Sequence, residues 1–184
     1  MKKIIFSLAM LFALQFSVQA QKYFTREGKV SFYSDAPMEK IEAHNTGATC
    51  VVDTENGKME FAVLIKAFQF EKALMQEHFN ENYMESGKYP KATFKGEIVN
   101  KDEVNFNKPG TYKAKVKGDM TIHGVTQPME ASGTITVGSG AVVISSEFEV
   151  QVADYKIAIP AVVKDNIAKV VKVTVSMNCA PLAK

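Results

Sequence analysis

The sequence lacks the features that usually indicate nucleic-acid binding, catalysis or metal binding. Its 22 basic and 20 acidic residues nearly balance, so there is no excess of positive charge to attract a phosphate backbone. It contains no H-E-x-x-H, no G-x-S-x-G and no glycine-rich phosphate-binding loop. Its three histidines, His44, His78 and His123, have no metal-ligand spacing. We therefore predict a protein that is not an enzyme, needs no metal or other cofactor, and binds no nucleic acid.

Cysteine is also scarce. Cys50 and Cys179 lie far apart in the chain, and neither belongs to a C-x-x-C pair or lies beside a histidine, so neither is a candidate nucleophile or ligand. In an oxidising compartment they could form a disulfide, and closing so long a loop would stabilise the fold by roughly 5 kcal/mol in the chain-entropy model. The alternative is two small core residues that never meet. The sequence leaves both open.

The N-terminus has the pattern of a secretory signal peptide. Lys2 and Lys3 precede an apolar stretch over residues 4–13, and Val18-Gln19-Ala20 forms a small-residue cleavage pattern. The apolar run falls short of the roughly 20 residues that a membrane span needs. We therefore predict cleavage after Ala20, export to the periplasm, no stable membrane insertion, and a single mature domain over residues 21–184.

Alternation of apolar and polar residues dominates the chain from Lys29 onward, and it is typical of half-buried strands. Asn56-Gly57, between two alternating runs, is a strong hairpin signal. Residues 71–82 are instead rich in helix formers and predict one short helical crossover. The eight predicted strands are residues 29–34, 47–54, 58–68, 91–100, 111–122, 125–137, 141–152 and 167–178. This number of antiparallel strands predicts an all-β barrel or sandwich.

The segment around His123 predicts the register of one hairpin. With His123 and Gly124 as the central residues of a tight turn, nearly every pair on one face is apolar and every pair on the other is polar. Histidine and glycine both suit a turn that requires positive φ. Pro128 falls at a non-hydrogen-bonded position, where its missing N–H removes no bond of this hairpin. This pattern favours a turn-forming role for His123 over a catalytic or metal-binding one.

The core-facing positions of the predicted strands are strongly apolar. They are Phe61, Val63, Ile65, Phe94, Tyr112, Val116, Met120, Ile122, Met129, Ile135, Ile144, Phe148, Val173, Val175 and Met177. An eight-stranded barrel has an interior just wide enough to be filled by side chains or to hold one ligand. From the residues alone, a filled core and a ligand tunnel remain equally open.

Three sequence blocks resemble the YceI family of exported bacterial proteins, which bind lipids and polyisoprenoids in a lipocalin-like barrel. "GDMTIHGVTQPMEASGTITV" over Gly118–Val137 is similar to the hairpin that marks the family. "EHFNENYMESGKYPKATFKGEI" over Glu77–Ile98 resembles its helix, Tyr-Pro turn and following strand, with His78 and Phe79 at matching positions. "DYKIAIPAVVKDNIAKVVKVTVSM" over Asp154–Met177 resembles its closing loop and last strand. A His-Ser pair that many members carry in the first strand is missing here.

The resemblance implies an eight-stranded antiparallel lipocalin-like barrel with a tunnel. The lining is then expected to comprise all the core-facing residues above except Met177, together with Phe68, Phe70, Leu74, His78 and Phe79 from the crossover. The expected function is to sequester or carry a long-chain isoprenoid lipid, either a polyisoprenoid or an isoprenoid quinone, as a monomer or a homodimer. Lys66, Lys72 and Lys91 are candidates for the tunnel mouth.

Two other functions remain as alternatives. One is an exported interaction module whose barrel core is filled and whose outer surface binds a protein partner. The other is an enzyme that uses Glu77, His78 and Tyr83, which would require these side chains to converge on one cleft.

Overall fold

The computed structural model describes residues 22–182, so the predicted signal peptide and its cleavage point lie outside the described part of the chain. Its strands are β1 (Lys22–Asp35), β2 (Lys40–Asp53), β3 (Lys58–Leu64), β4 (Gln69–Phe70), β5 (Lys91–Ile98), β6 (Gly110–Ile122), β7 (Val125–Val137), β8 (Val142–Gln151) and β9 (Val170–Pro181). Helix α1 (Ala73–His78) continues into a π-helical turn over Phe79–Tyr83. Short 3₁₀ turns cover Ile65–Ala67, Lys101–Glu103, Val152–Tyr155 and Ala161–Val163.

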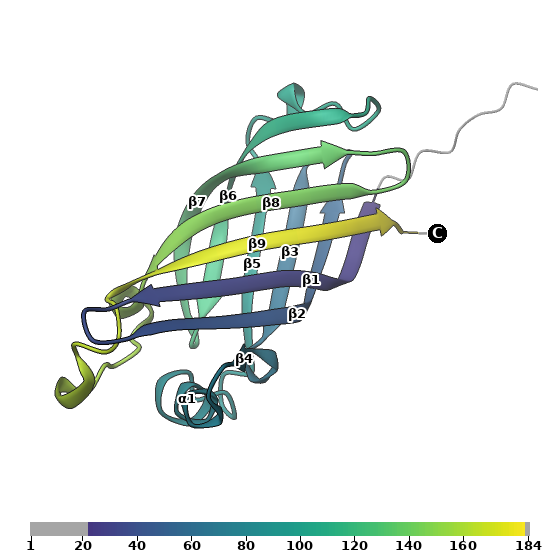
Figure 1. Ribbon diagram of the computed structural model, residues 1–184. Coiled ribbons are helices and arrows are strands. Elements are labelled where there is room, and N and C mark those ends of the chain that lie inside the picture. The colour runs from purple at the N-terminus through teal and green to yellow at the C-terminus, as the bar shows by residue number, and fades with distance from the viewer. Residues whose placement is uncertain (1–21, 183–184) are drawn as a thin grey trace, which may run out of the picture.

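The long strands form a closed antiparallel barrel (Figure 1). Neighbouring strands pair in the order β1-β9-β8-β7-β6-β5-β3-β2, and β1 also pairs with β2, which closes the sheet on itself. Among the strands of residues 22–182, closure leaves only β4, which has two residues, at an edge. The predicted eight-stranded barrel with one short helical crossover is therefore confirmed. Within residues 22–182, no helix has the length and apolar character needed to cross a bilayer.

The strand boundaries differ from the prediction mainly near the N-terminus. β1 begins at Lys22 and β2 at Lys40, each seven residues before the predicted start. The pairing of β1 with β2 is irregular between Thr25 and Val30, so apolar and polar residues do not alternate there. Without this alternation the sequence does not indicate a strand. Strand β3 ends at Leu64, before the predicted end at Phe68, because the chain turns there and the Ile65 amide donates to the Pro90 carbonyl at 3.0 Å.

The β6–β7 hairpin has the predicted register. Ile122 lies opposite Val125, and the pairing continues without a shift to Gly110 and Val137. His123 and Gly124 both have positive φ, 51° and 73°, as the tight turn requires. On the outer face the hydroxyls of Thr121 and Thr126 are 2.8 Å apart, and Lys117 forms an ion pair with Glu130, with a nitrogen–oxygen distance of 3.0 Å. The turn-forming role of His123 is therefore confirmed.

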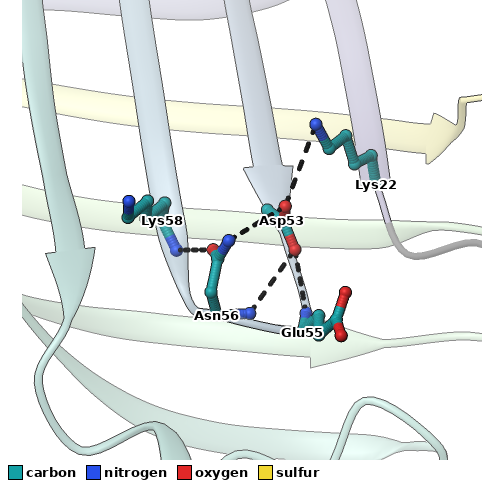
Figure 2. A network of polar contacts seen from close by, with 5 residues as sticks. All are labelled: Lys22, Asp53, Glu55, Asn56 and Lys58. Carbon is teal, nitrogen blue, oxygen red and sulfur yellow. Dashed lines mark hydrogen bonds and ion pairs between the residues drawn. The ribbon is translucent and has the colours of Figure 1, made fainter.

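The β2–β3 turn is held by the carboxylate of Asp53 (Figure 2). Its Oδ1 accepts from the amides of Glu55 and Asn56 at 3.0 and 3.4 Å, and its Oδ2 accepts from Asn56 Nδ2 at 3.2 Å. Asn56 Oδ1 in turn accepts from the Lys58 amide at 2.9 Å. The ammonium of Lys22, at the start of β1, lies 3.9 Å from Asp53 Oδ2. These contacts fix the predicted Asn56-Gly57 turn and tie it to the neighbouring strand.

This turn lies at the sealed end of the barrel, which we define as the end that carries the β2–β3 and β7–β8 turns and the segment 99–109. The interior is closely packed there. Fully buried or nearly fully buried side chains at this end include Val52, Ile98, Val104, Phe106, Val137 and Val142. The opposite, open end carries the β1–β2 and β6–β7 turns and helix α1 (Figure 1).

Cys50 and Cys179 belong to the core of the sealed end. They lie on β2 and β9, the two strands that flank β1, and both are free thiols with 1% and 0% of their surface exposed. The neighbouring Cys179 thiol and burial raise the pKa of Cys50. The two cysteines are therefore neighbouring core residues, and the alternative that they never meet is wrong.

Candidate functional site

The open half of the barrel encloses a cavity of about 370 Å³. This volume lies in the range of roughly 300–1,000 Å³ that is typical of small-molecule sites. Residues from all eight long strands contribute to the lining, together with the crossover between β3 and β5 and the segment between β8 and β9. The interior is therefore not completely filled by side chains, and the choice that the sequence left open is decided in favour of a hollow barrel.

Most of the residues predicted to line a tunnel do line this cavity. They are Phe61, Val63, Ile65, Phe68, Phe70, His78, Phe79, Phe94, Val116, Met120, Ile122, Met129, Ile135, Ile144, Phe148, Val173 and Val175. Those on the long strands project inward because alternate residues of a strand point to the same face of a barrel. Alternation was sufficient to place these strand residues, whereas Phe68, Phe70, His78 and Phe79 of the crossover were expected from the family resemblance.

Two predicted lining residues lie elsewhere. Leu74 is on α1 and remains 60% exposed, because it lies on the side of this short helix that faces away from the barrel. Tyr112 is on the inward face of β6, as expected, but it lies near the sealed end of that strand, beyond the cavity. Its hydroxyl donates to the Lys108 carbonyl at 2.9 Å. Alternation along a strand indicates which face a side chain is on but not its depth along the barrel axis. This explains why Tyr112 was wrongly expected in the lining.

A cluster of four aromatic rings attaches the crossover to the barrel. The ring of Phe79, from the π-helical turn, stacks on Phe32 of β1 with centroids 5.4 Å apart and lies 4.9 Å from Phe70 of β4. Phe68 packs against both Phe32 and Phe79, with centroid distances of 5.4 and 5.8 Å. Such tilted and offset pairs are favourable beyond the area they bury. All four rings also line the cavity, so the cluster forms part of its wall.

The lining residues that the sequence interpretation missed include two groups. One is on β1, where Val30, Phe32 and Ser34 alternate in the strand that was only partly predicted. The other is in the segment between β8 and β9, which contributes Ile157, Ile159, Val163 and Ile167. The alternation of Ile157 and Ile159 was a usable signal, but no strand is formed there, and only tertiary contacts bring the segment over the barrel mouth.

His123 holds both connecting segments of the open end. Its Nε2 lies 2.8 Å from Glu85 Oε2 in the crossover, and its Nδ1 lies 3.2 Å from the carbonyl oxygen of Tyr155 in the other segment. Its ring packs edge-on against Tyr89 with centroids 4.6 Å apart. The imidazole is 10% exposed. His123 therefore has a tertiary role in addition to its role in the turn, and no sequence pattern predicts this contact.

Several polar side chains lie near the mouth of the cavity. Glu39, from the β1–β2 connection, accepts a hydrogen bond from Asn166 Nδ2 at 3.4 Å and pairs with the ammonium of Lys72 at 3.5 Å. Lys72 is thus close to the mouth as predicted, but its charge is paired. Lys66 and Lys91 are exposed and do not line the cavity.

The side chains required by the enzymatic alternative do not converge. His78 and Tyr83 line the cavity, although His78 is also exposed, whereas Glu77 is exposed and is not part of the lining. Within residues 22–182 there is also no group of three or more histidine, cysteine, aspartate or glutamate side chains placed to hold a metal ion. The site described above is a mainly apolar cavity with a few polar groups, which is an arrangement suited to binding.

Known structures with the same architecture include a polyisoprenoid binding domain from Saccharophagus degradans implicated in plant cell wall breakdown. It has a TM-score of 0.77 and 11% identity, and the match covers 89% of this chain and 100% of that one. BcnA from Burkholderia cenocepacia has a TM-score of 0.68 and 16% identity over 83% and 96% of the two chains. The YCEI protein of Campylobacter jejuni has a TM-score of 0.53 and 16% identity over 77% and 85%. No curated protein matches the chain.

At these identities the structural likeness shows the fold alone. The family is shown by the sequence, because a family model described as the YceI-like domain matches residues 14–179, which is most of the chain. The chain belongs to the YceI-like domain family.

Proposed function

We propose that this protein is an exported carrier that sequesters a long apolar lipid, a polyisoprenoid or an isoprenoid quinone, inside its barrel. The observation that carries the proposal is the cavity of about 370 Å³, whose wall is formed mainly by aliphatic and aromatic side chains. Burial of a five-carbon isoprene unit contributes roughly 4 kcal/mol. A few units therefore supply useful affinity even after the cost of ordering the chain.

Three further observations support this proposal. Lys2, Lys3 and the small residues before position 21 have the pattern of a signal for export to the periplasm. Met59, Met120 and Met129 line the cavity, and methionine adapts its shape to a flexible ligand. The similar structure from Saccharophagus degradans is described as a polyisoprenoid binding domain. A role as a binding protein rather than an enzyme agrees with all three.

The rival function, an interaction module with a filled barrel core, is disfavoured by the same cavity. An empty apolar space costs stability because its walls lose packing contacts. An occupant that restores these contacts stabilises the folded state by binding to it.

Native mass spectrometry of the protein purified from its own host, followed by organic extraction, tests the proposal. We expect a bound isoprenoid lipid that is released by the solvent. Repeated recovery of empty protein that also fails to take up added prenyl lipids would overturn the carrier function.

A variant that fills the cavity makes the test specific. Ala131 of β7 lines the cavity opposite Val116, so the ring of Ala131→Phe would occupy the space of the ligand. We expect lipid uptake to fall at least about tenfold, with a change in unfolding free energy of only about 1 kcal/mol because the ring enters a void rather than a packed core. Lys113→Phe, on the outer face of β6, is the matched control and should bind lipid normally.

A further inference from the structure

The charges around the cavity indicate which kind of lipid head group it accepts, if the proposed lipid-binding function holds. Among the described residues that line the cavity, Glu39 is the only one with a carboxylate, and none is a lysine or an arginine. Phosphorylated groups are recognised in proteins chiefly by arginine and lysine side chains, by backbone amides and by metal ions. The cavity thus lacks the basic side chains that would bind a pyrophosphate head.

Glu39 lies at the cavity mouth, where a charged head group would have to pass. Its side chain is 30% exposed at the mouth, and its two carboxylate oxygens contact Lys72 at 3.5 Å and Asn166 at 3.4 Å. Lys72 immediately precedes α1, and Asn166 belongs to the segment between β8 and β9, so the carboxylate joins both segments that cover the open end. A phosphorylated head entering here would face a negative charge, and the adjacent ammonium is already paired with that charge.

The same mouth offers hydrogen-bond donors to an uncharged oxygen. His78, at the end of α1, and Tyr83, at the end of the π-helical turn, both line the cavity, with His78 exposed and Tyr83 half-buried at the mouth. Neither side chain has a hydrogen-bond or ion-pair partner within residues 22–182. An imidazole carries at least one N–H donor in either charge state. Partial burial raises the pKa of Tyr83, which keeps its hydroxyl protonated and able to donate.

We propose that the cavity selects isoprenoids with an uncharged oxygen-containing head, such as a quinone or an alcohol. His78 and Tyr83 supply the hydrogen-bond donors for this head, and Glu39 disfavours a pyrophosphate. The aromatic wall around Phe79 then holds the first part of the chain, and the apolar cavity holds the rest.

The test compares three ligands of equal prenyl chain length: a quinone, a headless hydrocarbon and a pyrophosphate. Dissociation constants are measured with the intact mature protein by displacement of a fluorescent prenyl probe, to which this tryptophan-free chain adds no indole emission. We expect the quinone to bind at least about tenfold more tightly than the pyrophosphate. Equal or tighter binding of the pyrophosphate would overturn the inference. If none of the three ligands binds, the proposed lipid-binding function itself fails.

A substitution at Glu39 tests whether this residue determines the preference for a quinone over a pyrophosphate. Glu39→Gln should raise pyrophosphate affinity about tenfold and leave quinone affinity unchanged. Glu42→Gln is the matched control, because Glu42 lies on the neighbouring strand β2, has a side chain that is 58% exposed, and is not part of the lining. If Glu39→Gln leaves pyrophosphate affinity unchanged, Glu39 does not determine the selectivity.

The double variant His78→Phe with Tyr83→Phe tests the donors. Its quinone affinity should fall about tenfold, whereas its affinity for the hydrocarbon should stay the same and so report an intact cavity. Unchanged quinone affinity in a variant that still binds the hydrocarbon would show that these two side chains are not the donors.

Discussion

The two ends of the barrel contain similarly apolar strands but differ in packing. At the sealed end, Val52, Val142 and Cys179 have none of their surface exposed. At the open end, inward residues such as Phe148 and Val173 are only half-buried, because they face the cavity rather than another side chain. An apolar inward position can therefore be either core or cavity wall, and the strand pattern is the same in both cases.

The difference arises from the segments that close each end. At the sealed end, the short segment 99–109 places Val104 and Phe106 in the core. At the open end, two longer segments, between β3 and β5 and between β8 and β9, cover the mouth. They are held there by the aromatic cluster around Phe79, by His123 and by Glu39. The contrast between a filled end and a covered end can be tested by mutation.

The largest effect is expected from Phe106→Ala at the sealed end. Phe106 is 8% exposed and packs in the core, so its loss leaves a cavity and should reduce the unfolding free energy by about 3–5 kcal/mol. Phe148→Ala, on the cavity wall, should cost clearly less because one side of that ring already faces open space. Denaturant unfolding of both variants provides the measurement. Equal losses would mean that the two ends are packed alike.

A smaller loss is expected from Phe79→Ala at the open end. The substitution removes ring contacts with Phe32 and Phe70, and since Phe79 is half-buried we expect about 2 kcal/mol, below the range for a buried phenylalanine. Amide hydrogen exchange should accelerate in residues 73–83 and remain slow at the sealed end. Uniform acceleration in all strands would show that the crossover is not an independent cover.

His123→Asn should have a still smaller effect. Asparagine tolerates the positive φ of 51°, so the turn should persist, but the contacts with Glu85 and Tyr155 are lost. We expect a loss of about 1–2 kcal/mol, because the hydrogen bond to the carboxylate is strong but Glu85 is partly exposed. Thermal unfolding measures it, and Glu85→Gln, which keeps an acceptor, is the control. An unchanged melting temperature would leave His123 with a role in the turn only.

The smallest effect is expected from Leu74→Ala. This side chain is 60% exposed on α1 and does not line the cavity, so stability should change by less than about 0.5 kcal/mol and lipid uptake should be normal. A clear loss of lipid binding would restore Leu74 to the lining predicted from the sequence.

Local pattern predicted the fold well because strand alternation and turn chemistry are local properties. A tight turn that places Ile122 opposite Val125 predicts the register of β6 and β7, and this register is correct over the whole hairpin. The irregular register of β1 interrupts the alternation in its first half, so this half of β1 and the start of β2, which pairs with it, were not predicted. Leu74 was misplaced because a helix of six residues carries too few positions to define its buried face.

The sequence by itself determined the antiparallel strands, the hairpin at His123 and the apolar inward face, because each depends on residues that are neighbours along the chain or across one turn. The tertiary structure alone decided that the interior is hollow at one end and packed at the other. It also decided that His123 joins Glu85 to Tyr155, that Cys50 meets Cys179, and that Glu39 lies at the mouth. These features depend on where distant segments come together, and no period in the sequence encodes such contacts.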